Sequence, residues 1–175
     1  MIIDTHTHTF PDRIAARALA GMEKSIVDKH DWNVKIKVAG TRDALSESTK
    51  KNGVDISVVV PVATKPEQSA SINEFAAQTN EKTKETGVFS LGAIHPDNED
   101  YKDILDDIKK KGLKGIKVHP DYQKVEFDDP RYLRIFKYAD ELGLVIVTHA
   151  GEDIGLPEKI HCTPDMVLNV LNKVN

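Results

Sequence analysis

The chain has 175 residues, enough to bury one sizeable core, and 39% of them are hydrophobic. Its 24 basic and 28 acidic residues give a net charge of -4, too small and too mixed in sign for a nucleic-acid-binding surface, so the expected partner is a small molecule. Because Cys162 is the only cysteine and neither a signal peptide nor an apolar run of ~18 residues is present, we expect a single soluble domain, 1–175, in the cytoplasm.

Short apolar, β-branched stretches recur along the chain and predict five strands. Most are continuously apolar rather than alternating, which is typical of parallel strands covered on both faces. In chain order they are 1–5, 54–62, 88–94, 113–118 and 144–148. Helical patterns follow them at 41–51, 67–85, 101–111, 130–141 and 163–174. Gly53, Gly87 and Gly143 each stand between a helix and the next strand, where a left-handed residue ends a helix.

This repeated strand–helix order predicts an α/β fold. The turn after the first strand lacks the glycines of a nucleotide-binding sheet, so a TIM barrel, (β/α)8, is favoured over a doubly wound sheet. The chain holds five βα units, and we expect an open arc of five parallel strands, truncated after the fifth helix. Its raw edges leave room for a homo-oligomer. The segment 12–40, helical at 13–27, is predicted to be an insertion after the first strand.

The strongest chemical signal is a His-x-His pair at the end of the first strand. His6 and His8 are two residues apart in an extended segment, so their side chains point to the same side and can converge on one ion. Asp4, two residues before His6, points to the same side of the strand and lies one layer deeper, where it can hydrogen-bond a metal ligand. The alternative is a polar strand end with two exposed histidines.

A third histidine, His149, follows the fifth apolar strand and precedes Ala150 and Gly151. In a barrel the carboxyl ends of all strands meet at one rim, so His149 can join His6 and His8. Three imidazoles leave a coordination position open, as in a catalytic site. They favour zinc, with manganese, iron or nickel as alternatives and one or two ions undecided. A buried structural role for His149 stays open.

Other polar residues follow the fourth and fifth strands. Lys117 and His119 are two residues apart in a strand, so both side chains are expected to point into the barrel. A buried lysine needs either a partner such as Asp4 or carboxylation of its amine. His119 either contacts the ligand or caps the loop. Asp121, Tyr122 and Gln123 come next and can reach a ligand. The loop 151–163 carries Glu152, Asp153 and His161, of which His161 is a substrate-binding candidate.

Together these motifs resemble the amidohydrolase superfamily, and more closely its branch of barrel enzymes that includes metal-dependent decarboxylases. Segment 3–8 is similar to that family's first-strand ligand pair, 115–120 to its fourth strand and 148–151 to its fifth-strand ligand. The resemblance implies a hydrolase that acts on a small molecule through a metal-activated water. It also places a later histidine and a catalytic aspartate beyond Asn175, so the chain's own catalytic acid–base residue is unknown. We therefore expect the chain alone to bind metal weakly and turn over little.

Other functions remain open. A metal-dependent decarboxylase on the same fold is the first alternative. A phosphoesterase beginning with the same His-x-His pair would continue into Ser-Asp-Gly, which 9–12 does not, and a barrel nuclease would carry a glutamate where this chain has Lys117 or His119. The last alternative is a non-catalytic fragment that binds metal without turnover.

Overall fold

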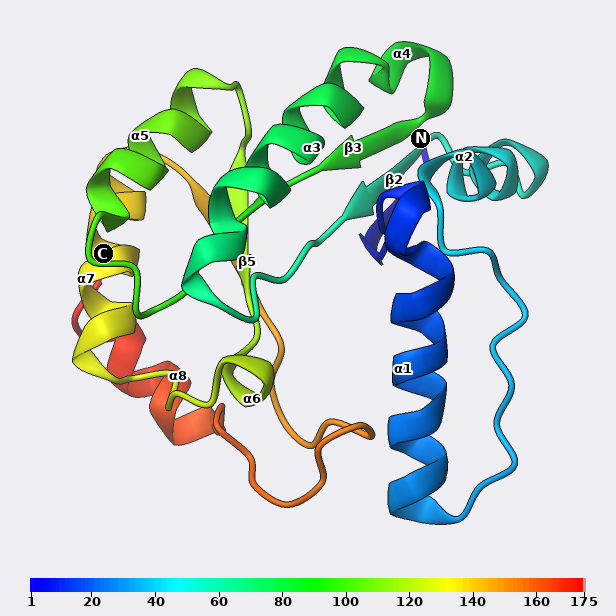
Figure 1. The fold of residues 1–175 in the computed structure, drawn as a ribbon. Coiled ribbons are helices and arrows are strands. Elements are labelled where there is room, and N and C mark those ends of the chain that lie inside the picture. The colour runs from blue at the N-terminus through cyan, green and yellow to red at the C-terminus, as the bar shows by residue number, and fades with distance from the viewer. Residues whose placement is uncertain (175) are drawn as a thin grey trace. The chain divides into compact units, whose positions relative to one another are not determined.

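A computed structural model describes residues 1–174, and the chain divides into two compact units, each built on a three-stranded parallel sheet (Figure 1). The first unit comprises 1–59 and 78–90; the second comprises 60–77 and the residues from 91 onward. No helix within 1–174 is both long enough and apolar enough to cross a membrane.

In the first unit the strands run in sequential order, β1-β2-β3, and all pair in parallel. Thr41 begins α2, since its hydroxyl accepts a hydrogen bond from the backbone of Ala44, and Gly87 ends α4 with φ +70°. The elements of this unit are β1 (Ile3–Thr7), α1 (Asp12–His30), α2 (Arg42–Lys51), β2 (Ile56–Val59), α4 (Thr83–Thr86) and β3 (Val88–Ser90).

Helix α3 (Ser69–Glu81) contributes 69–77 to the second unit and 78–81 to the first. Each part carries an asparagine whose side-chain amide bonds both backbone groups of one strand residue. In the first unit, Asn80 accepts from the nitrogen of Ser90 at 2.6 Å and donates to its oxygen at 2.9 Å. In the second, Asn73 does the same for Ala93 at 2.8 and 3.1 Å. The two amides thus satisfy backbone groups that a neighbouring strand would otherwise pair.

In the second unit the order is β4-β5-β6, again all parallel. The core lies between this sheet and helices α5 and α7, and its fully buried members include Leu105, Ile116, Tyr132 and Phe136. The elements are the 3-10 helix η1 (Pro66–Gln68), β4 (Gly92–Ala93), α5 (Tyr101–Lys110), β5 (Gly115–Val118), α6 (Pro120–Gln123), α7 (Pro130–Glu141), β6 (Val145–Thr148) and α8 (Pro164–Leu171).

Gln123 organises the carboxyl ends of these strands. Its buried amide nitrogen donates to the backbone oxygens of Ala63 and Ile94, both at 2.8 Å. Its oxygen accepts from the backbone nitrogen of His119 at 2.9 Å and from the hydroxyl of Tyr132 at 2.6 Å. All four hydrogen bonds that an amide can form are made, so Gln123 holds the loop and is not available to a ligand.

The predicted alternation of parallel strands and helices in sequential order is confirmed, as are the left-handed glycines Gly53, Gly87 and Gly143. Two details were wrong. The stretch 88–94 forms two strands, β3 and β4, in different sheets, because each pairs with a different neighbour on either side of Leu91. The helix predicted at 67–85 is interrupted at Lys82, so that η1, α3 and α4 are separate elements.

Candidate metal and substrate site

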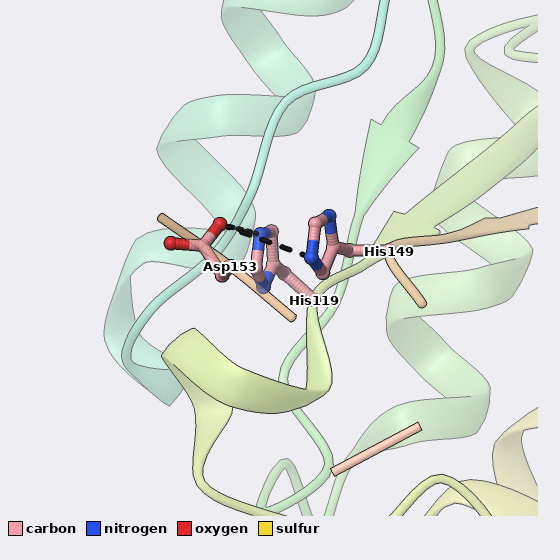
Figure 2. Close-up of side chains that lie close together, drawn as sticks. All are labelled: His119, His149 and Asp153. Atoms are coloured by element: carbon pink, nitrogen blue, oxygen red, sulfur yellow. Dashed lines mark ion pairs between the residues drawn. The ribbon is translucent and has the colours of Figure 1, made fainter. Parts of the chain in front are cut away.

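Two histidines follow neighbouring strands of the second sheet. Val118 of β5 pairs with Thr148 of β6, so His119 and His149 leave the sheet side by side at its carboxyl edge. Their imidazole rings stack with centroids 4.2 Å apart and planes 4° from parallel (Figure 2). The parallel register of two adjacent strands is therefore what brings these side chains together.

Asp153, in the loop after β6, completes a cluster with these histidines. Its Oδ2 lies 3.3 Å from His119 Nε2 and 3.9 Å from His149 Nε2, the two pairs that Figure 2 marks. Its other oxygen accepts a hydrogen bond from the backbone nitrogen of Gly155 at 2.7 Å, which fixes the carboxylate on the loop. One ligand atom from each of the three side chains lies within 4.8 Å of the other two.

Asp121 lies next to His149 of the cluster, with its side chain 1% exposed. Its Oδ1 accepts from the backbone nitrogen of His161 and faces the ring Nδ1 of the same residue, both at 2.9 Å. Its Oδ2 lies 3.9 Å from His149 Nε2, and neither of these two buried atoms has a hydrogen-bond partner within the described part of the chain. A buried carboxylate oxygen and an imidazole nitrogen that face each other without partners are costly unless a cation or water lies between them.

Burial sets the charge state of the groups around the cluster. Burial, and then the neighbouring His149, lower the pKa of His119 to about 4, so its ring is neutral near pH 7. His119 also caps α6, since its Nδ1 accepts from the backbone nitrogen of Tyr122 at 3.4 Å, and the ring of Tyr122 packs on it at 4.2 Å. Burial, helped by Asp153 and Asp121, raises the pKa of Tyr122. His119 and Tyr122 were predicted as ligand-binding candidates; His119 is part of this cluster, and Tyr122 packs against it.

Lys117, one layer below His119 in β5, is fully buried, and its amine has no hydrogen-bond partner among residues 1–174. Burial lowers the pKa of this amine to about 8. The expectation that the lysine points inward is met. Its pairing with Asp4, which belongs to the first unit, and its carboxylation stay predictions.

A pocket of about 210 Å³ opens beside the cluster. His161, predicted to bind substrate, contributes to its wall together with Asp121 and Lys124. Leu156, Glu158 and Lys159 line the rest. The pocket thus combines an apolar wall with charged groups of both signs, which suits a small polar ligand.

The first-strand histidines lie in the first unit. His6 and His8 are exposed and on the same side of the strand, with ring centroids 5.1 Å apart, and Asp4 accepts a hydrogen bond from the backbone nitrogen of His6 at 3.2 Å. The two rings therefore lie close together, and the binding of one ion by His6 and His8 stays a prediction. Because His149 belongs to the second unit, the convergence of all three histidines stays a prediction.

The sequence assigned neither Asp121 nor Asp153 to the metal. Asp121 stands two residues beyond His119 and Asp153 four residues beyond His149, and that position was the available signal. Imidazole nitrogens and carboxylate oxygens are ordinary ligands of zinc and manganese, and the unpartnered atoms of Asp121 and His149 are those a cation would satisfy. The residues present therefore fit a divalent metal.

The sequence of the chain matches a known protein family. A family model described as Amidohydrolase matches residues 3–170. The chain belongs to the amidohydrolase family. No curated protein matches the chain. The resemblance inferred from the His-x-His, His119 and His149 segments is thus confirmed at the level of the family.

Solved structures of amidohydrolase-type barrels share the fold. A 5-carboxyvanillate decarboxylase from Novosphingobium aromaticivorans, with manganese and 3-methoxy-4-hydroxy-5-nitrobenzoic acid, matches with a TM-score of 0.63 at 15% identity, over 87% of this chain and 51% of that one. A 2,6-dihydroxybenzoate decarboxylase complexed with 2,6-dihydroxybenzoate gives 0.53 at 14% identity, over 87% of this chain and 50% of that one. A probable 2-pyrone-4,6-dicarboxylic acid hydrolase from Acinetobacter baumannii gives 0.52 at 12% identity, over 85% and 49%.

The amidohydrolase chain spans about half the length of these solved chains. Its parallel strands alternating with helices correspond to about half of a TIM barrel, as predicted. Family members are enzymes, and the matched structures include decarboxylases and a hydrolase. Two of the matched structures are decarboxylases, the reaction considered above as the alternative to hydrolysis, and the metal in one of them is manganese, whereas zinc was favoured above.

Proposed function

We propose that this chain forms part of a metal-dependent decarboxylase that acts on a small aromatic carboxylic acid. The observation that carries the proposal is the unpartnered Nε2 of His149, which faces the free carboxylate oxygen of Asp121 at the end of β6 in a chain of this family. The two matched decarboxylases, one with manganese and an aromatic acid bound, support the choice of reaction.

In this proposal His149 holds the divalent ion, manganese or zinc, through its imidazole nitrogen, and two ligand sets could complete the coordination: the predicted His6 and His8, or imidazole and carboxylate groups of the second unit. The bound ion supplies a Lewis acid that polarises oxygens of the substrate. The pocket beside the cluster receives the aromatic ring against Leu156, and Lys124 in its wall attracts the acid group. His119, neutral near pH 7, and Tyr122 form one wall of the cluster and exclude water.

Decarboxylation breaks the bond between a ring carbon and its carboxylate; the electron pair stays on that carbon, and a proton replaces CO2 there. We assign the proton delivery to His161. Asp121 Oδ1 lies 2.9 Å from its Nδ1 and holds the ring, which leaves Nε2 as the nitrogen that gives its proton to the ring carbon. A ring that carries a proton on each nitrogen can donate from Nδ1 to Asp121 and from Nε2 to the carbon, and solvent then replaces the proton that was used.

The test incubates the metal-free chain, with and without Mn²⁺, with 2,6-dihydroxybenzoate and 5-carboxyvanillate labelled in the carboxyl group, and measures released labelled CO2. Slow, metal-dependent release is expected, abolished in His149→Ala and about 100-fold slower still in His161→Gln. His30→Gln, at the C-terminal end of α1 in the first unit, is the matched histidine control and should keep the full rate. Equal rates in His149→Ala and the unsubstituted chain would sink the proposal.

A hydrolase is the second candidate, favoured by the match to the pyrone dicarboxylic acid hydrolase. The same panel therefore includes a pyrone lactone. Metal-dependent ring opening without CO2 release would replace the decarboxylase proposal by this one.

A further inference from the structure

The second unit gathers, without help from the first, three side chains of the types that bind divalent cations. We infer that His119, His149 and Asp153 form a divalent-cation site of their own, which needs neither His6 nor His8. The inference does not rest on the proposed reaction, since it concerns binding alone.

The distances fit an ion with modest closure of the side chains. Nitrogen and oxygen ligands lie ~2.0–2.2 Å from zinc, which places neighbouring ligand atoms about 3.4 Å apart in a tetrahedral site. Asp153 Oδ2 already lies 3.3 Å from His119 Nε2 and 3.9 Å from His149 Nε2. Only fractions of an ångström separate these pairs from the expected spacing.

A second, independent observation points to a ligand at this place. Asp121, with its side chain 1% exposed, directs an unpartnered oxygen at His149 Nε2, 3.9 Å away, and that nitrogen is also buried and unpartnered. Within residues 1–174 no side chain or backbone group satisfies either atom. A cation on His149 would neutralise the two carboxylates that face it, Asp121 and Asp153, and give each a partner.

The stacking of the His119 and His149 rings determines which contacts must change when an ion binds. The lone pairs of two parallel imidazoles do not converge, so His119 has to tilt away from its 4° alignment with His149. His119 Nδ1 then gives up its 3.4 Å contact with the backbone nitrogen of Tyr122, a distance at the weak end for a hydrogen bond. Metal binding should therefore shift the ring signals of both histidines and the backbone amide signal of Tyr122.

The experiment titrates Mn²⁺ and Zn²⁺ into the full metal-free chain by calorimetry and records ring and amide NMR signals with the diamagnetic Zn²⁺. The double variant His6→Ala/His8→Ala should bind one ion with a Kd within about three-fold of the unsubstituted chain. Asp153→Asn, His119→Gln and His149→Gln should each weaken binding about ten-fold or more. Glu152→Gln, an exposed neighbour in the same loop, is the matched control for Asp153→Asn and should leave the Kd unchanged.

Thermal melts of each variant without metal verify that it folds. Loss of binding in the folded His6→Ala/His8→Ala double variant would overturn the inference while agreeing with the three-histidine site of the proposed function. An Asp153→Asn variant that binds as tightly as Glu152→Gln would also overturn it. Absence of turnover with intact binding would instead remove the proposed reaction and leave this inference standing.

Discussion

Replacing Lys117 by methionine is expected to stabilise the protein. The lysine is fully buried in β5, and its amine lacks a hydrogen-bond partner among the described residues. Burial lowers the pKa of the amine from 10.5 to about 8. At about 1.4 kcal/mol for each pKa unit, keeping the charged amine buried costs about 3 kcal/mol near pH 7. Methionine has a similar length and no charge, so most of this cost is removed.

The sign of the pH dependence follows from linkage. Below pH 8 the amine is protonated in both the folded and the unfolded chain, so the full cost is present. Between about pH 8 and 10.5 the folded amine loses its proton first, the unfolded chain binds more protons, and the stability of the unsubstituted protein rises with pH. The advantage of Lys117→Met should thus shrink from about 2–3 kcal/mol at pH 7 to about 1 kcal/mol or less near pH 10.5.

Urea denaturation in EDTA at pH 7, 8.5 and 10.5 measures the free energy of unfolding of the unsubstituted protein and of Lys117→Met. Taking the difference between the two removes the contribution of the titratable groups that both proteins contain. Lys114→Met, at an exposed position three residues earlier, is the control and should change stability by less than about 0.5 kcal/mol. A Lys117→Met variant that is less stable at pH 7 would refute the reasoning, because it would mean that the amine has a partner worth more than its burial costs.

Four further substitutions test packing, backbone conformation and one ion pair. Gln123→Leu should cost about 3 kcal/mol or more in urea denaturation, since it leaves four buried backbone and side-chain groups unpaired; an unchanged midpoint would contradict the role given to this amide. Gly115→Ala should cost about 3 kcal/mol, because its β-carbon would lie 2.3 Å from the backbone oxygen of Val145, whereas Gly21→Ala, open to solvent in α1, should gain about 0.5–1 kcal/mol. Hydrogen bonds from Arg131 lower the pKa of Asp129 below 3.8, so the stability from this pair should be lost as pH falls below 4. Melts between pH 6 and 2.5 should show a smaller acid loss in Asp129→Asn.

Local signals in the sequence were sufficient to predict where helices begin and end. Asp129 and Thr163, each followed by proline, begin α7 and α8 with side-chain caps, a pattern that can be read from the sequence. Gly53 and Gly143 take the left-handed conformation because no β-carbon opposes it there. These features depend on residues within one turn of one another, and a single sequence contains them.

Features that depend on distant partners escaped prediction. The change of sheet at Leu91 depends on which strands lie on either side, and β4 has only two residues. The cluster at the site depends on the register of β5 with β6, which places His119 beside His149, and on a loop that returns Asp153 to them. Apolar periodicity marks a strand but not its neighbour, so the sequence offered Asp153 only as one polar residue of a long loop.

The side-chain amide of Asn73 has a consequence for strand β4. A strand of Gly92 and Ala93 alone has too little side-chain pattern to choose its register against β5, and a slip by one residue would turn Ala93 to the opposite face. Asn73 bonds both backbone groups of Ala93 and no others in this strand, so it selects one register. The correct alignment of a two-residue strand is thereby specified by a helix that forms from local contacts, and an Asn73→Leu chain would keep its apolar composition but lose that selection.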